Sequence, residues 1–224
     1  MFCPCCGNSH ITELKNNEPV ADLKCNNCFE IFELKSKEGN VGRKINDGAY
    51  ATMIDRITSI TNPELFVLQY SPNYIVTDLI LIPKFFFVPQ IIEERKPLAS
   101  TAQRAGWRGC NILYSKIPQQ GKIDIIRNGV IRPINQVVKN YMKIKKLETG
   151  NVNSRSWLLD VLSCINNIET NEFCLRDVYK YTEVLQEKYI HNHNVEAKIR
   201  QQLQFLRDKG FIEFLGRGHY KKSF

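Results

Sequence analysis

Two pairs of cysteines near the N-terminus constrain the fold more than any other feature of this sequence. "CPCC" supplies Cys3 and Cys6, and "CNNC" supplies Cys25 and Cys28. Two such C-x-x-C knuckles, about twenty residues apart, have the spacing of a zinc site. They place four thiolates tetrahedrally around one Zn²⁺ at ~2.3 Å. We therefore expect a structural Zn²⁺ site that ties the N-terminus to the second knuckle.

The other cysteines are predicted to have plainer roles. Cys5 lies inside the first knuckle and is interpreted as a bystander that could compete with Cys6. Cys110, Cys164 and Cys174 are scattered and are predicted to be buried hydrophobic residues. A site closed by four thiolates leaves no position for water, so it should support structure and not chemistry.

Composition bounds the class of protein. The 224 residues carry a net charge of +8, which is compatible with a polyanionic partner. No run reaches ~18 apolar residues, so we expect no membrane span; the richest run, "LILIPKFFFVP", is broken by Pro83 and Lys84. The N-terminus lacks the basic and apolar regions of a secretory signal. A reducing cytoplasm is therefore expected, where clustered cysteines more often bind metal than form disulfides.

Hydrophobic patterning indicates two domains. Strands are predicted at 65–70, 75–82 and 123–129, and helices at 47–60 and 132–147. The polar segment "ETGNVNSR" (148–155) favours a linker. The predicted boundaries are 1–147 for the first domain, 148–153 for the linker and 154–224 for the second domain.

The last seventy residues or so predict a winged helix-turn-helix. Three helical stripes precede a hairpin, "FIEFLGRGHYKK" (211–222), with a Gly-Arg-Gly turn. The stripes consist of Trp157, Leu158, Val161, Leu162 and Ile165; of Val178, Tyr181, Leu185 and Tyr189; and of Ile199, Leu203 and Leu206. The alternative is a small helical cap with a β-tail.

The third helix favours the DNA-binding interpretation. Its positions outside the apolar stripe carry long hydrogen-bond donors, which suit base edges and phosphates: Lys198, Arg200, Gln201, Gln202 and Gln204. Arg217 at the hairpin turn, with Lys221 and Lys222, could contact the DNA backbone.

An acid–lysine pattern surrounds the second knuckle. If residues 19–24 and 29–36 form antiparallel strands, their pairing sets Asp22 opposite Ile31. Asp22, Glu33 and Lys35 then share one face of the ribbon, because side chains alternate with a period of two. Two carboxylates and a lysine suit phosphodiester hydrolysis with Mg²⁺ held through oxygen. The alternative is a solvated face of salt bridges.

Three long blocks resemble the DpnI-like methyl-directed restriction endonucleases. They are "CPCCG…NNEPVADLKCNNCFEIFELKSKEGN…INDGAYATM", "RKPLASTAQRAGWRGCNI" and "IRQQLQFLRDKGFIEFLGRGHYKK", and the resemblance spans Cys3 to Lys222. It implies an α/β PD-(D/E)xK restriction-endonuclease-like domain followed by a winged helix. It implies cleavage of double-stranded G-A-T-C sites carrying N6-methyladenine, between adenine and thymine, with blunt ends.

The resemblance also implies roles for single residues. Asp22 and Glu33, with the carbonyl of Leu34, would bind Mg²⁺, and Lys35 would be the catalytic lysine. Trp107 looks like the aromatic residue that meets the methylated adenine; the alternative for it is a core tryptophan. The winged helix would read the same mark on the helix opened by "HNHNVEAKIRQQ", and its predicted contacts are Asn194, Lys198, Arg200, Gln201 and Arg217.

One departure from the family pattern bears on activity. The resemblance implies a helix ahead of the first knuckle, but only Met1 and Phe2 precede Cys3. The expectation is an N-terminally truncated chain or a misassigned start codon. The motif residues favour an active enzyme, while the missing segment favours the alternative of a catalytically impaired methyl-adenine reader or regulator. A monomer is expected, because one chain would contain both a nuclease and a reader.

Overall fold

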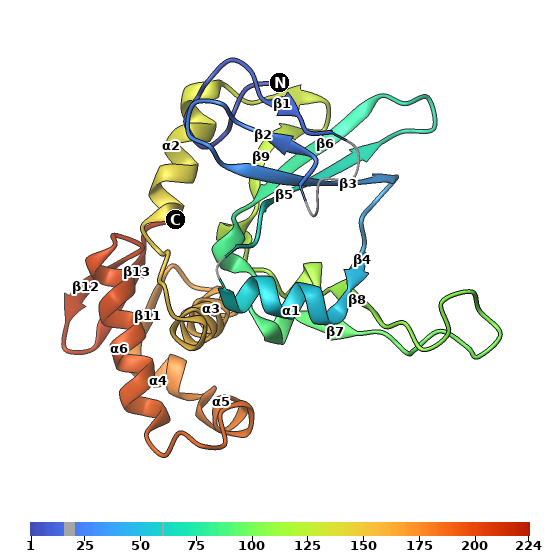
Figure 1. Cartoon of the computed structure of the whole chain (residues 1–224). Coiled ribbons are helices and arrows are strands. Elements are labelled where there is room, and N and C mark those ends of the chain that lie inside the picture. Colours follow the sequence, from blue (N-terminus) through green and yellow to red (C-terminus); the bar gives the residue numbers. More distant parts are fainter. Residues whose placement is uncertain (16–20, 60) are drawn as a thin grey trace. The chain divides into compact units, whose positions relative to one another are not determined.

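The computed structural model describes residues 1–15, 21–59 and 61–224 (Figure 1). The chain divides into two compact units, Met1–Glu148 and Thr149–Phe224. Among the described residues, none of the helices combines the length and the apolarity that crossing a bilayer would require.

The first unit is a mixed α/β domain. Its strands are β1 (Thr12–Glu13), β2 (Leu23–Lys24), β3 (Ile31–Glu38), β4 (Ile45–Ala49), β5 (Glu64–Tyr70), β6 (Val76–Ile82), β7 (Ile92–Glu94), β8 (Gly109–Ile112), β9 (Ile123–Arg127) and β10 (Val130–Ile131). Its α-helices are α1 (Tyr50–Ser59) and α2 (Ile134–Lys145). Its described 3₁₀ helices are η1 (Lys84–Phe86), η2 (Pro89–Ile91), η3 (Tyr114–Lys116) and η4 (Gln119–Gly121).

Seven strands form the main sheet of this unit, in the order β1-β2-β3-β5-β6-β9-β10. Of the strand pairs in the described part of the chain, only β3 and β5 run parallel, and parallel neighbours need a long crossover connection. Here that crossover contains β4 and α1, and β4 joins β8 and β7 in a separate three-stranded sheet. The crossover therefore carries the chain from the main sheet into the small sheet and back.

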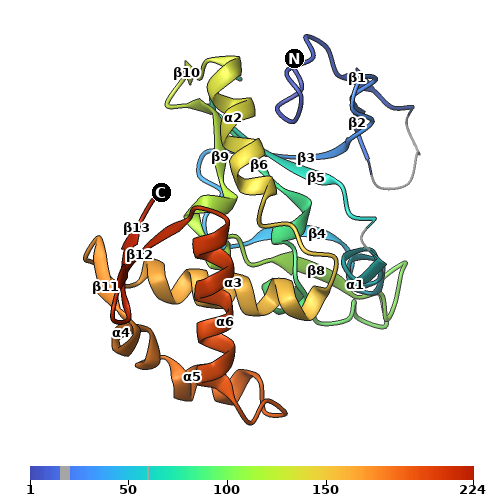
Figure 2. The same ribbon diagram turned by 90° about the vertical axis from the view of Figure 1, so that its left-hand side faces the viewer.

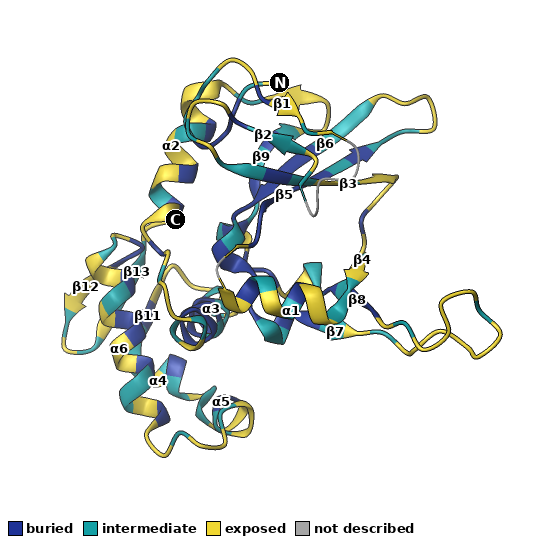
Figure 3. Ribbon diagram, viewed as in Figure 1, coloured by how far each residue is buried: buried dark blue, intermediate teal, exposed yellow. Residues whose placement is uncertain are grey.

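The core of the unit is centred on β5. Leu65, Phe66 and Val67 are all buried, as is typical of a central strand covered on both faces (Figure 3). Phe66 stacks on Phe32 of β3, with ring centroids 4.8 Å apart. Helix α2 packs against β9, where it buries Val137 and Tyr141 (Figure 2).

The predicted elements of this unit are found with shifted ends. β5, β6 and β9 occupy the segments predicted as strands, and α2 occupies the second predicted helix. The helix predicted over 47–60 begins only at Tyr50, because residues 45–49 form strand β4 instead; residue 60 lies outside the described residues.

The register of β2 against β3 differs from the prediction. Leu23 pairs with Phe32, which brings Asp22 level with Glu33 and not with Ile31. The turn is longer than the four residues of the knuckle, because Phe29 takes a positive φ of 62° and the amide of Cys25 donates to the carbonyl of Glu30 at 2.9 Å. The error is two residues, so the predicted face is unchanged. Positions 19 and 20 of the predicted strand lie outside the described residues.

A buried carboxyl group links the sheet to α2. Glu64, at the start of β5, is fully buried. Its Oε1 accepts a hydrogen bond from the Tyr141 hydroxyl at 2.8 Å, and its Oε2 accepts one from the Lys84 amide at 3.0 Å. Burial raises the pKa of Glu64 from 4.5 to about 7, although the hydrogen bond from Tyr141 opposes that shift.

The second unit has the element order of a winged helix. Its elements are α3 (Val152–Asn166), β11 (Glu172–Cys174), α4 (Leu175–Tyr179), α5 (Thr182–Lys188), α6 (Val195–Asp208), β12 (Ile212–Gly216) and β13 (His219–Lys222). The three strands form one sheet in the order β11-β13-β12. Trp157 of α3 is buried and stacks on Tyr189, with ring centroids 3.8 Å apart.

Three details of this unit differ from the sequence prediction. α3 begins at Val152, inside the segment predicted as a linker, because the Asn151 side chain accepts hydrogen bonds from the next amides and caps the helix. The second apolar stripe belongs to two short helices, α4 and α5, because the chain leaves helical geometry at Tyr181. Strand β11 was not predicted; the hairpin with its Gly-Arg-Gly turn was, and it is present.

The raised pKa of Glu64 predicts a pH-dependent stability. A carboxyl group that holds its proton more tightly in the folded state stabilises the fold below its unfolded pKa, and this contribution is lost as the pH rises through 7. We expect the free energy of unfolding of the wild type, relative to Glu64→Gln, to fall by about 2 kcal/mol between about pH 5.5 and pH 8. Urea titrations at both pH values measure it.

The matched control is Glu38→Gln, which alters an exposed carboxylate on β3. Its difference from the wild type should stay flat over the same pH range. An equally flat difference for Glu64→Gln would show that Glu64 does not hold its proton in the folded protein.

Candidate functional site

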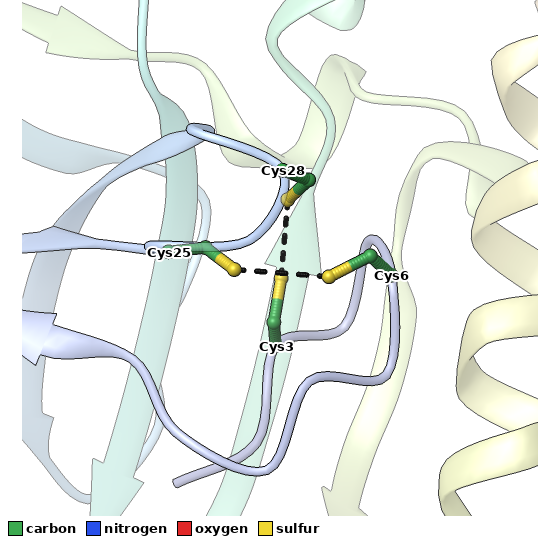
Figure 4. Close-up of side chains that lie close together, drawn as sticks. All are labelled: Cys3, Cys6, Cys25 and Cys28. Atoms are coloured by element: carbon green, nitrogen blue, oxygen red, sulfur yellow. Dashed lines mark hydrogen bonds between the residues drawn. The ribbon is translucent and has the colours of Figure 1, made fainter.

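Four cysteine side chains converge at the end of the β2–β3 hairpin. The sulfur atoms of Cys3, Cys6, Cys25 and Cys28 all lie within 4.8 Å of one another (Figure 4). The Cys3–Cys28 and Cys6–Cys25 sulfur distances are both 3.7 Å. Four thiolates at ~2.3 Å from a tetrahedral Zn²⁺ would be about 3.8 Å apart, so the cluster fits Zn²⁺ in donor type, number and spacing.

The surroundings of the sulfur atoms suit thiolates. A hydrogen bond from the Cys5 thiol lowers the pKa of Cys3 to about 5, and the Asn27 amide approaches the Cys6 sulfur at 3.4 Å. Burial, in contrast, raises the pKa of Cys28. A bound cation would lower the pKa of Cys28, because it favours the charged form of every thiol around it.

Cys5 lies outside the cluster. It is buried, and its thiol hydrogen-bonds with Cys3 and with Tyr141 of α2. Its side chain therefore joins the knuckle to the protein core, which agrees with its interpretation as a bystander to the metal site.

The hairpin brings the acid–lysine residues together on one face. Asp22 precedes β2, and its Oδ2 accepts a hydrogen bond of 2.7 Å from the amide of Leu34 on β3. Glu33 and Lys35 flank Leu34 on that strand, and the Lys35 ammonium lies 2.5 Å from Glu33 Oε1. The Asp22 carboxylate is thus bound to the amide of the residue that lies between Glu33 and Lys35.

A further acid completes this cluster. Asp47 of β4 places its Oδ1 2.7 Å from the Lys35 ammonium, and its side chain is only 7% exposed. Asp47 was not predicted as part of the site, because "DGAYATMIDRITSI" (47–60) was interpreted as a helix. The available signal was a carboxylate at the first position of that predicted helix, inside a block that carries the family resemblance.

Burial and the neighbouring charges together shift the pKa values of Glu33 and Lys35. Burial and the neighbouring Asp47 raise the pKa of Glu33, although Lys35 counters them. Burial lowers the pKa of Lys35, but the charges of Glu33 and Asp47 outweigh it and the net pKa is raised. Lys35 is therefore a charged ammonium held between two carboxylates.

Trp107 lies in the long connection between β7 and β8, in contact with the β8 backbone. Its carbonyl accepts from the amide of Leu98 at 3.0 Å, and its ring is half-buried and not part of the core. A Cβ atom on Gly109 would come within 2.9 Å of the indole ring. Because Gly109 has no side chain, it leaves room for the indole ring of Trp107.

The surface of α6 carries most of the predicted contact residues. Asn194, Arg200, Gln201 and Gln204 are exposed, Lys198 is half-buried, and Arg217 is exposed at the hairpin turn. Arg200 donates to the Tyr179 hydroxyl at 2.5 Å, and Lys198 donates to Gln201 at 2.7 Å.

Two residues of the predicted contact surface lie elsewhere. Gln202 was predicted outside the apolar stripe but is buried, with 6% of its surface exposed. It lies next to Leu203 on the inner side of α6. The ammonium of Lys222 donates to the carbonyl of Ile168, so this lysine ties the hairpin to the segment that follows α3.

Comparison with known families gives two matches. The sequence model of the DpnI family, described as the Dam-replacing family, matches residues 1–150. A second model, described as the Dam-replacing HTH domain, matches residues 153–222.

The cysteine cluster predicts one bound Zn²⁺ per chain. Cys28→Ser removes one of the four ligands, and we expect zinc content measured by mass spectrometry to fall well below one per chain. The thermal midpoint should fall by about 10 °C or more, as when a strong chelator is added, because the binding energy of the metal contributes to folding.

Cys5→Ser is the matched control, because it alters the same knuckle outside the cluster. It should retain one Zn²⁺. Full zinc occupancy in Cys28→Ser, or its loss in Cys5→Ser, would contradict this ligand set.

Proposed function

Because the chain belongs to the DpnI family, also described as the Dam-replacing family, we propose that it is a methylation-dependent restriction endonuclease. The observation that carries the proposal is the grouping of Asp22, Glu33 and Lys35 on one face of a hairpin whose turn ends in the cysteine cluster. Two acids and a lysine at one place suit metal-assisted hydrolysis of a phosphodiester.

A PD-(D/E)xK nuclease domain is part of this proposal. Three features support it: a hairpin that carries the acids and the lysine, a parallel pair formed by β3 and β5, and a helix within the crossover between them. On this proposal the nuclease is the unit Met1–Glu148, the DNA-binding domain is the unit Thr149–Phe224, and the chain acts as a monomer.

The donors in the cluster suit Mg²⁺. Carboxylate oxygens of Asp22 and Glu33 and the carbonyl of Leu34 are hard ligands of the kind that this ion prefers. When bound, the ion would polarise the scissile phosphate and activate water. The ammonium of Lys35 would orient that water and stabilise the charge that develops on the phosphate.

The proposed substrate is double-stranded DNA with N6-methyladenine in G-A-T-C, cut between adenine and thymine to leave blunt ends. Trp107 would contact the methyl group from the nuclease domain. In the second domain, the exposed hydrogen-bond donors of α6 and Arg217 of the hairpin would contact the DNA. Burying one methyl group contributes only ~0.8 kcal/mol, so reading the mark in both domains would add discrimination that one domain cannot supply.

Cleavage should depend on methylation, on a divalent cation and on Glu33. The first experiment incubates a plasmid, with and without adenine methylation at G-A-T-C, with the protein and Mg²⁺ or EDTA. We expect cutting of the methylated form alone and only with Mg²⁺. Glu33→Gln should lower the cleavage rate by about 10²- to 10³-fold, because a carboxylate ligand of the ion is lost.

Glu38→Gln is the matched control, since it makes the same change on the same strand at an exposed position. Its rate should equal that of the wild type. Retained binding of the methylated plasmid without any cutting would indicate instead a methyl-adenine reader or regulator.

The packing of Trp107 predicts how methylation is discriminated. Trp107→Ala should reduce the ratio of cleavage rates for methylated and unmethylated sites by about fourfold per methyl group, which corresponds to ~0.8 kcal/mol. Gly109→Ala should change the ratio in the same direction, because its Cβ displaces the indole.

Ser100→Ala, an exposed change in the same connection, should leave the ratio unchanged. A wild-type ratio in both the Trp107 and the Gly109 variants would exclude Trp107 as a reader of the methyl group.

A further inference from the structure

We infer that Asp47 is a positioning residue for Lys35, and that it holds the ammonium in place when Glu33 turns its charge toward a divalent cation. This inference rests on the proposed nuclease function. Asp47 comes from β4, outside the hairpin that carries the predicted site, and it reaches Lys35 at 2.7 Å.

The backbone orients the Asp47 carboxylate independently of Lys35. Its Oδ1 also accepts a hydrogen bond of 2.6 Å from the amide of Gly48, the next residue along the chain. β4 is in turn held by β8, where Asp47 pairs with Cys110. Backbone contacts thus orient the acid, and Lys35 is the flexible partner of the pair.

The second oxygen of Asp47 indicates a functional and not a purely structural acid. Oδ2 is buried and has no hydrogen-bond partner within the described part of the chain. A buried carboxylate oxygen without a partner is unfavourable for stability, so such a group marks a site shaped by another requirement. Arg56 of α1 adds positive charge that acts on both Asp47 and Glu33.

Lys35 needs a second partner because Glu33 has two tasks. Glu33 Oε1 pairs with the Lys35 ammonium at 2.5 Å. As a ligand it would share its charge with the cation, and its attraction for the ammonium would weaken while the cation repels Lys35. Asp47 approaches from a different strand, so it can retain the ammonium through that change.

The geometry favours this role over a metal ligand. Asp47 Oδ1 already contacts two hydrogen-bond donors, the Gly48 amide at 2.6 Å and the Lys35 ammonium at 2.7 Å. The Lys35 ammonium occupies the place between Glu33 and Asp47.

A double-mutant cycle tests whether Asp47 acts through Lys35. Single-turnover cleavage of a methylated duplex is measured at saturating protein and Mg²⁺ for Asp47→Ala, Lys35→Ala and the double variant. We expect Asp47→Ala to lower the rate by about 10²-fold, with Asp47→Asn intermediate because it keeps an oxygen for Gly48 and Lys35. In the Lys35→Ala background, Asp47→Ala should lower the cleavage rate by less than about twofold.

Two further measurements separate positioning from other roles. The Mg²⁺ concentration at half-maximal rate and the affinity for methylated DNA in Ca²⁺ should match the wild type in Asp47→Ala. Glu93→Ala, which breaks the neighbouring Lys44–Glu93 ion pair of 2.6 Å, is the matched control and should leave the rate unchanged. A full 10²-fold loss in the Lys35→Ala background, or a raised Mg²⁺ requirement, would overturn the inference in favour of a metal ligand.

A measurement that needs no cleavage keeps this inference separate from the proposed function. Acetylation of Lys35 in the presence of Mg²⁺, followed by peptide mass spectrometry, should be several-fold faster in Asp47→Ala and in Asp47→Asn than in the wild type. Lys37, an exposed lysine on the same strand, should react at the wild-type rate. Equal labelling of Lys35 in correctly folded variants would refute the positioning role even if the wild type cuts no DNA.

Discussion

The cysteine cluster is the constraint on which the first unit depends. β1 and β2 are two residues long, so their ladders contribute few hydrogen bonds and specify register weakly. The cluster joins Cys3 and Cys6 to the turn between β2 and β3, only three residues from Asp22. A metal ion bound at that point would fix the turn, and the turn holds Asp22 against β3. On the proposed function, a metal in this cluster would influence the acid–lysine residues through the backbone and not by contact with substrate.

Inside the fold, the acid–lysine cluster is a balance between burial and charge. Burial and the charge of Asp47 raise the pKa of Glu33, and Lys35, which lies between the two acids, opposes that rise. Lys35 carries its charge between the two carboxylates, and that charge counters the rise in the pKa of Glu33. Because these groups interact, the effects of single substitutions here should not be treated as independent contributions.

What the sequence predicted correctly was local or periodic. The cysteine spacing specifies a cluster within two short turns, and the alternation of a strand puts Glu33 and Lys35 on one face whatever the register. The predicted register of β2 against β3 was wrong, because the left-handed conformation of Phe29 lengthens the turn beyond the knuckle. Asp47 was missed since it reaches the cluster from another sheet, and "INDGA" has no apolar alternation to indicate a strand.

The second unit shows why exposed donors on a helix do not translate directly into contacts. Arg200 already donates to Tyr179, and Lys198 donates to Gln201. On the proposed function, binding DNA exchanges these internal hydrogen bonds for new ones, so each contact contributes only the difference. Base contacts of this kind would therefore contribute more to sequence discrimination than to affinity. Affinity then depends mainly on phosphate contacts and should be strongly salt-dependent, in keeping with a chain of net charge +8.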